Sequence, residues 1–313
     1  METTEVRTGK NDTQDTSPTL EACVDSFRRH LRGAKSENTL RLYVETVEQL
    51  AAFLTDQGMP RRVSSVRAEH IEVYFEHLRE LGRSDNTVSA RYRALRAFFR
   101  WAVKPGREIK EHPMDGMEPP QVSEQPAATP TDDEIAALLK ACQGKNFPAR
   151  RDDAMIRLAF DAGLRRAELT ALTLKDIDLD TKVVRVLHGK GDRFRLAAFG
   201  DRTAEAIDRY MRVRSGHRYH YRPELWVGER GALGSQGFYH MLAVRTEAAG
   251  IKLRPHQLRH FFAHEAKRRG MSDEQLMQLG GWKSAETLKR YGQSLAAQRA
   301  VEAYHAKSAG DRF

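Results

Sequence analysis

The sequence predicts a mainly α-helical chain with two helical domains and a small antiparallel β-sheet in the second. Apolar residues recur three and four positions apart, as on one face of a helix, over residues 20–103 and again from residue 131. A proline-rich stretch separates these regions, and β-favouring residues form paired runs only within 183–199. The 313 residues, 40% of them hydrophobic, are enough to bury two ordinary cores.

Charge and cysteine usage narrow the choice of partner and compartment. The formal charge is +9, with 52 Lys and Arg residues, which favours a polyanionic partner, although many basic proteins bind no nucleic acid. Cys23 and Cys142 lie far apart within helical patterns, which indicates buried thiols in a reducing compartment and not a disulfide or a metal site. The polar start of the chain resembles no signal peptide, and no apolar run approaches the about 18 residues of a membrane span. We therefore expect a cytoplasmic protein that makes no membrane contact.

The first domain is expected over residues 19–105, after a disordered tail. Residues 1–18 are rich in Thr, Asp, Asn and Lys, a composition that cannot bury a core. No strand pattern interrupts the helical periodicity that follows, so we expect a four-helix bundle. The first two helices are expected to begin near Leu20 and Thr39, the third to carry Ile71, and the fourth to begin near Asn86 or Thr87.

The fourth of these helices carries a basic stripe. Arginines recur along it at spacings of three and four, and no acidic residue lies between Asp85 and Glu108 to pair with them. A solvated polar face would explain isolated arginines, but a stripe of a single sign favours contact with phosphates. The residues predicted to contact nucleic acid are Arg91, Arg93, Arg96 and Arg100.

A linker and a second domain account for the rest of the chain. Residues 106–130 contain five prolines and little apolar periodicity, which predicts a semi-extended linker. The second domain is expected over residues 131–313, where Thr131 and Glu134 form a capping box that opens the first helix. Later helices are expected at about 148–162, 201–213, 235–249, 255–269, 272–280 and 294–304.

The only clear β signal in this domain is a hairpin. Two β-favouring runs flank the turn residues 189–192, and this pattern is typical of two antiparallel strands. Lys190 lies at the predicted tip, where a lysine is ordinarily just solvated. Residues 225–227 are expected to add a short edge strand.

Polar side chains gather where helices begin and end. Gly163 ends one helix and Arg165 starts the next, with Glu168 three residues on and able to hold a partly buried arginine. Pro255 can begin another helix, on which His256 and Arg259 share a face.

The following junction has the same character. Ser272 and Gln275 form a capping box that starts a helix, which Gly280 and Gly281 end. Trp282 follows directly, and a last short helix would deliver Tyr291. Sites are usually built at such junctions.

Together these residues resemble the tyrosine recombinase (phage integrase) family, over residues 20–305. The elements occur in the family's order: Arg165 in GLRRAEL, Lys190 in GKGD, His256 and Arg259 in HQLRH, Trp282 after LGG, and Tyr291 nine residues later. The resemblance implies a core-binding domain at 19–105 and a catalytic domain at 131–313, without an arm-binding domain. Most members have His where this chain has Trp282, whose indole can donate a hydrogen bond but cannot shuttle a proton.

The resemblance also implies a role for each residue. Tyr291 would be the nucleophile and form a 3′-phosphotyrosine link. Lys190 would protonate the leaving 5′-oxygen, and His256 would assist proton transfer at Tyr291. Arg165 and Arg259 would grip the non-bridging oxygens of the phosphate.

Three further residues would support this grip. Trp282 would donate one more hydrogen bond to the same oxygens. Glu168 would orient Arg165, and His260 would pack or hydrogen-bond beside the site. A metal face formed by His256, His260 and His264 is disfavoured, because no Cys or acid completes it. No cofactor is expected.

The resemblance implies a site-specific DNA recombinase that exchanges strands as a tetramer on two copies of a double-stranded DNA site. Such an enzyme would be associated with the nucleoid. Two alternatives stay open: a type IB topoisomerase-like enzyme, which cleaves and reseals without exchanging partners, and a catalytically silent DNA-binding protein.

Overall fold

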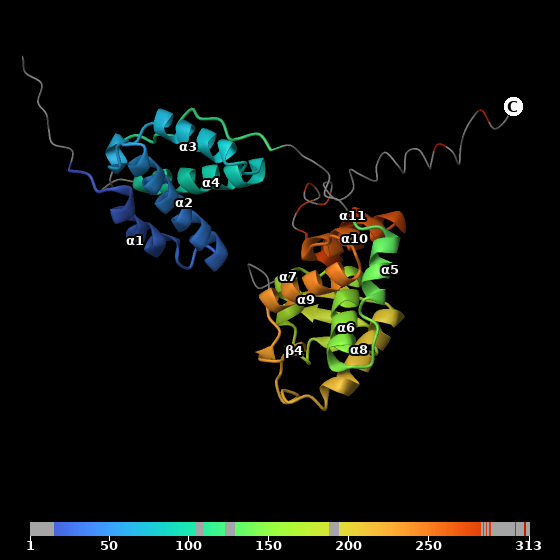
Figure 1. The fold of residues 1–313 in the computed structure, drawn as a ribbon. Helices are drawn as coiled ribbons and strands as arrows, with labels where there is room; N and C mark the ends of the chain where they lie inside the picture. The colour runs from blue at the N-terminus through green and yellow to red at the C-terminus, as the bar shows by residue number, and fades with distance from the viewer. Residues whose placement is uncertain are drawn as a thin grey trace, which may run out of the picture. The chain divides into compact units, whose positions relative to one another are not determined.

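The computed structural model describes residues 16–103, 109–122, 129–187 and 194–282, together with residues 284, 286, 288, 304 and 310. The chain divides into two compact units, Met1–Glu124 and Gln125–Phe313. Within the described residues the structure is mainly helical with two small antiparallel sheets, so the predicted fold class is confirmed (Figure 1).

Unit 1 is a four-helix bundle built around α2. This helix packs against all three of its neighbours. Ser36 and Ser84 cap α2 and α4, because each hydroxyl accepts the backbone N–H three residues later. Large apolar side chains, among them Phe27, Phe98 and Trp101, are fully buried between the helices. The helices are α1 (Leu20–Leu31), α2 (Glu37–Asp56), α3 (Ala68–Glu80) and α4 (Asp85–Ala102).

The predicted tail and linker partly pack against this bundle. Residues 1–15 of the tail lie outside the described residues, but the Pro18 carbonyl accepts the Val63 N–H at 3.0 Å. Within the predicted linker, Met114 is completely buried in the unit 1 core. A single apolar residue among prolines has no periodicity, which is why the sequence predicted only a connection there.

Unit 2 is built around α6 (Phe147–Asp161), which contacts α7, α8, α9 and α10. Its other helices are α5 (Asp132–Lys140), α7 (Arg166–Ala171), α8 (Asp201–Arg214), α9 (Ser235–Ala248), α10 (Pro255–Arg268) and α11 (Asp273–Gly280). Pro255 begins α10, as the sequence predicted. The helix predicted at 294–304 lies outside the described residues, apart from Tyr304.

The β structure of unit 2 comprises two small antiparallel sheets. In the first, β1 (Ile177–Asp178), β2 (Val183–Val186) and β3 (Arg195–Ala198) pair in that order. The second pairs β4 (Val227–Gly228) with β5 (Gly231–Ala232), so the short strand predicted at 225–227 begins only at Val227 and belongs to a separate two-stranded sheet. The tip of the β2–β3 hairpin, residues 188–193, lies outside the described residues.

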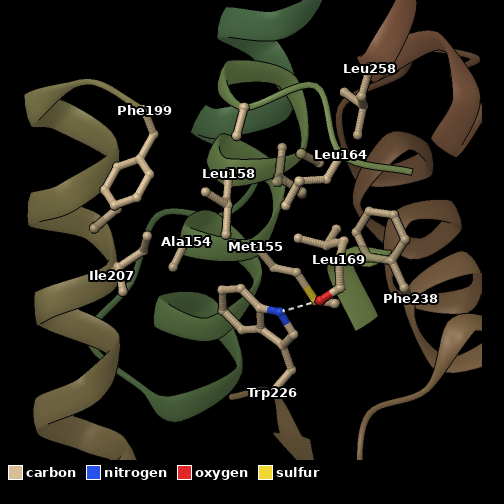
Figure 2. Packing of buried hydrophobic residues seen from close by; sticks show 14 of the residues in the cluster. Ala154, Met155, Leu158, Leu164, Leu169, Phe199, Ile207, Trp226, Phe238 and Leu258 are labelled. Carbon is tan, nitrogen blue, oxygen red and sulfur yellow. Dashed lines mark hydrogen bonds between the residues drawn. The ribbon is translucent and has the colours of Figure 1, made fainter. Parts of the chain in front are cut away.

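The unit 2 core joins α6 to the helices on both sides of it. Figure 2 shows Ala154 and Leu158 of α6 between Ile207 of α8 and Leu164. Trp226 is fully buried and its indole N–H donates to the Leu169 carbonyl at 2.9 Å. Each such large apolar side chain contributes about 1.5–3 kcal/mol by its burial, so this core holds the α6–α7 junction firmly. None of the helices described has the length and apolarity required to span a membrane.

Candidate active site

Glycines end the two helices, α6 and α11, whose C-terminal ends meet at the candidate site. Gly163 follows α6, and a Cβ there would lie 2.2 Å from Cδ1 of Phe262. A Cβ on Gly280, the last residue of α11, would lie 1.8 Å from Cζ3 of Trp282. Gly281 adopts a left-handed conformation with φ of 67°, which ends α11 and turns the chain toward Trp282. These glycines allow close packing that no other residue would permit.

Arg165 and Glu168 form a local pair at the start of α7. The Glu168 carboxylate accepts the Arg165 backbone N–H at 2.9 Å and its Nη1 at 2.7 Å. The Glu168 side chain is only 5% exposed, whereas that of Arg165 is 45% exposed. The carboxylate therefore holds a guanidinium whose outer side faces solvent. Nη2 of Arg165 also donates to the Gly281 carbonyl at 2.6 Å.

Arg259 is buried at 3% exposure and lies on α10. Its guanidinium donates to the carbonyls of Gly163 and Gly280, the latter at 2.7 Å. Its Cζ atom lies 3.9 Å from the centroid of the Trp282 ring, so the two make a cation–π contact. Trp282 is itself buried, and its ring is nearly parallel to that of Phe262. Trp282 is thus a platform that supports the Arg259 guanidinium.

A third arginine, which sequence reasoning missed, completes the site. Arg195 on β3 donates through Nη2 to Oε2 of Glu168 at 2.5 Å and through Nη1 to the Leu279 carbonyl. Three successive carbonyls at the end of α11 thus each accept a different arginine. We call this group the arginine cap: Arg195 on the carbonyl of residue 279, Arg259 on that of residue 280, and Arg165 on that of residue 281. Cations are stabilised at a helix C-terminus, where the last carbonyls lack intrahelical partners.

Glu168 supplies the negative charge that pairs with Arg165 and Arg195 of the arginine cap. Burial acts to raise the pKa of this carboxyl, but the Arg195 charge and the hydrogen bonds from Arg165 lower it overall. Burial lowers the pKa of Arg195, and Glu168 opposes this shift. One ionised carboxylate therefore lies between two guanidinium groups.

His256 and His260 lie on the same helix as Arg259 and form an edge-to-face pair at 4.5 Å. Desolvation, followed by the charges of Arg259 and Arg165, lowers the pKa of His256. Burial and the neighbouring His256 and Arg259 lower the pKa of His260 to about 4. Both rings are therefore neutral at pH 7.

The structure thus brings together six of the residues predicted for the site: Arg165, Glu168, His256, Arg259, His260 and Trp282. Lys190 and Tyr291 lie outside the described residues. No group of three or more His, Cys, Asp or Glu side chains in the described part of the chain is arranged to hold a metal ion.

The four arginines predicted to contact DNA differ in their surroundings on α4. Arg93 and Arg100 have exposed side chains. Arg91 is half-buried and donates to Oγ1 of Thr46 on α2 at 3.2 Å. Arg96 donates to the Tyr92 hydroxyl at 2.9 Å. Two residues span about 200° around a helix, so Arg91 faces the bundle where Arg93 faces solvent.

Comparison with known families assigns both units. Residues 129–298 match the Phage integrase family, and residues 24–110 match the Phage integrase, N-terminal SAM-like domain. The first match alone spans more than half of the chain. The chain belongs to the phage integrase family. Its members are tyrosine recombinases, so the chain is an enzyme that breaks and rejoins DNA strands.

Relatives of this family extend over most of the chain. Tyrosine recombinase XerC of Chromohalobacter salexigens is 31% identical over 291 residues, which cover 91% of this chain and 95% of that protein. Tyrosine recombinase XerD of Halalkalibacterium halodurans is 29% identical over 270 residues, or 85% of this chain and 89% of that protein.

Solved structures share the fold. A lambda integrase dimer bound to a COC′ core site has a TM-score of 0.70 at 18% identity, covering 88% of this chain and 78% of that one. The Tn1549 transposon integrase in complex with circular intermediate DNA has a TM-score of 0.70 at 21% identity, covering 88% of this chain and 95% of that one.

Proposed function

We propose that this tyrosine recombinase acts on a specific double-stranded DNA site and exchanges strands as a tetramer on two copies of that site. The observation that carries the proposal is the convergence of Arg165 and Arg259 on adjacent carbonyls. Two guanidinium groups that bind neighbouring carbonyls can donate to the two non-bridging oxygens of one phosphodiester. Their planar donor groups give directional hydrogen bonds. The Arg165 side chain is 45% exposed, so DNA can reach its guanidinium from solvent.

In the proposed cleavage step, the phenol oxygen of Tyr291 forms a bond to phosphorus while the bond to the 5′-oxygen breaks. His256 takes the phenol proton, a task that suits an imidazole held neutral by its lowered pKa. Lys190 gives a proton to the leaving 5′-oxygen. Arg165 and Arg259 stabilise the charge on the phosphate oxygens, and the reverse step rejoins a strand from the second site.

Three further residues of the predicted set act on these groups. We propose that Glu168 orients Arg165, because its buried carboxylate binds both the main chain and the guanidinium of that residue. Trp282 supports Arg259 by their cation–π contact and donates to the phosphate through its indole N–H. His260 packs edge-to-face against His256 and keeps its ring oriented.

The exposed charge on α4 and the DNA-bound structural neighbours support this proposal. The exposed Arg93 and Arg100 on α4 suit contacts with backbone phosphates, which give affinity and register but no sequence information. The lambda and Tn1549 integrases, which share the fold, were solved bound to DNA. Two subunits on each of two sites make a tetramer.

The test is to map where the protein becomes covalently attached to DNA. Fragmented DNA of the host replicon is incubated with the full chain, adducts are trapped with detergent, and the attached ends are sequenced. A nicked duplex that carries the mapped site should then accumulate adduct with wild type and none with Tyr291→Phe. Adduct in the Phe variant would show that the nucleophile is another residue. Relaxation of a plasmid that lacks the site would favour a topoisomerase-like activity instead.

A further inference from the structure

Arg195 occupies an unusual place for a charged residue. Its side chain is 11% exposed, and it lies on the same face of β3 as the buried Ala197, while Leu196 between them is exposed. A buried charge is costly unless ionic and hydrogen-bonding partners compensate for it. Here Glu168 supplies the negative charge and the Leu279 carbonyl accepts a second N–H.

These two bonds connect parts of the chain that are distant in sequence. Glu168 lies 27 residues before Arg195, at the start of α7, and Leu279 lies 84 residues after it, in the last turn of α11. A Cβ on Gly281 would lie 2.6 Å from Nε of Arg195, so the guanidinium lies directly against the turn that leads to Trp282. Arg195 thereby contacts both supports of the phosphate-gripping arginines: the carboxylate that binds Arg165 and the turn whose carbonyls bind Arg165 and Arg259.

We propose that Arg195 is a positioning residue for the cleavage reaction, which fixes Arg165 through Glu168 and fixes the α11 turn through the Leu279 carbonyl. This inference rests on the proposed function. Without Arg195, Oε2 of Glu168 keeps only its bond from the Arg165 backbone N–H, so the carboxylate is held less firmly. Arg165 then loses its fixed orientation, and the turn below Arg259 loses one of its three bonds. DNA still binds, but the guanidinium groups meet the phosphate in the wrong geometry.

The experiment compares Arg195→Met with wild type under single-turnover conditions, with full-length protein in excess over a nicked duplex that carries the mapped site. Met keeps most of the aliphatic volume but neither hydrogen bond. We expect the rate of adduct formation to fall by about 10- to 100-fold, the cost of a misplacement on the order of 1 Å. The Kd for the duplex should change by less than about three-fold.

A second substrate separates positioning from a general loss of structure. In a duplex with a methylphosphonate at the scissile position, one charged oxygen is replaced by a methyl group, so the phosphate depends less on arginine contacts. We expect Arg195→Met to slow adduct formation on this duplex by less than about three-fold. An equal loss on both substrates, or no loss on the ordinary phosphate, would overturn the proposal.

Two more variants complete the design. Arg157→Met is the matched control, because Arg157 is also mostly buried in unit 2 and bound to a carboxylate, Asp153, away from the arginine cap. It should leave both cleavage rates unchanged. Arg195→Lys keeps the charge but lacks the forked donors, so it should lose less activity than Met and show the same difference between substrates. If Arg195→Met does not fold, the Lys variant alone decides. Should wild type itself form no adduct, the proposed function would fail and not the role of Arg195.

Discussion

Gly280 offers a substitution for which general rules and the structure predict opposite results. It lies in the last turn of α11 with an ordinary helical backbone. Gly-to-Ala changes in a helix usually stabilise a protein by about 0.5–1 kcal/mol. Here, however, the new Cβ would lie 1.8 Å from Cζ3 and 2.2 Å from Cε3 of Trp282. The indole ring cannot stay in place, and overpacking of this kind costs about 1–3 kcal/mol.

The displaced ring would also disturb its neighbours. The centroid of the Trp282 ring lies 3.9 Å from Cζ of Arg259, and the ring stacks on Phe262. Displacement of the ring therefore removes a contact that holds Arg259 in the arginine cap. We expect Gly280→Ala to lower the Tm of unit 2 by about 2–12 °C, since a cost of about 1–3 kcal/mol corresponds to about 2–4 °C per kcal/mol for a unit of this size. Adduct formation should fall at least as much as it does for Arg195→Met.

The assay for Gly280→Ala is thermal unfolding of the full chain, followed by single-turnover cleavage. Gly216→Ala is the control, because a Cβ at Gly216 would meet only the Val213 carbonyl, at 3.9 Å. The control should melt within about 1 °C of wild type. A Gly280→Ala protein that melts at or above the wild-type temperature would refute the inference that the glycine is there to admit the indole.

Three further predictions concern charge. Glu168→Gln should destabilise unit 2 by about 3–5 kcal/mol in urea unfolding at pH 7, because two guanidinium groups lose their carboxylate. The pKa of Glu168 is lowered in the folded protein, so the stability that the carboxylate contributes is complete above its unfolded pKa of about 4.5 and is lost as the pH falls through the folded pKa. The loss of stability in acid should therefore be smaller in the Gln variant. His260 has a pKa of about 4 in the folded protein, so below pH 6.5 this residue binds more protons in the unfolded chain and the folded state loses stability. His260→Gln should therefore reduce the stability that the protein loses between pH 7 and 5 by about 2 kcal/mol. Arg93→Ala and Arg100→Ala should each weaken DNA binding and lower the slope of log Kd against log salt concentration by about one. Arg91→Ala should mainly lower the Tm of unit 1, because the variant loses the bond to α2. Equal effects of all three substitutions on DNA affinity would contradict this division.

Local patterns in the sequence predicted the parts of the site that depend on neighbouring residues. Arg165 and Glu168 are three apart at a helix start, and the structure has them bonded there. Pro255 and the glycine pair also lie where the pattern predicted helix ends. In each case the partners are close in sequence, so spacing alone is informative.

The sequence could not identify contacts between distant segments. Arg195 was overlooked because both of its partners lie far away along the chain. One local signal was available: in an alternating strand, the charged Arg195 falls on the side of Ala197 and the apolar Leu196 on the other. An inverted pattern of this kind indicates a buried charge with a fixed partner. The contact of Arg91 with Thr46 likewise depends on which side of α4 meets α2, which periodicity in one helix does not give.

The glycine pair and the arginine cap form one physical unit, and this explains why they occur together. Gly280 leaves room for the indole on which Arg259 rests, and a Cβ on Gly281 would lie 2.6 Å from Arg195 and 3.4 Å from Arg165. The left-handed turn at Gly281 also exposes the final carbonyls of α11 to the three guanidinium groups. We therefore expect a larger residue at either position to displace an arginine of the cap while Arg165, Arg195 and Arg259 are all still present. One added methyl group at Gly280 should therefore lower cleavage by this chain although none of the proposed reacting residues has been changed.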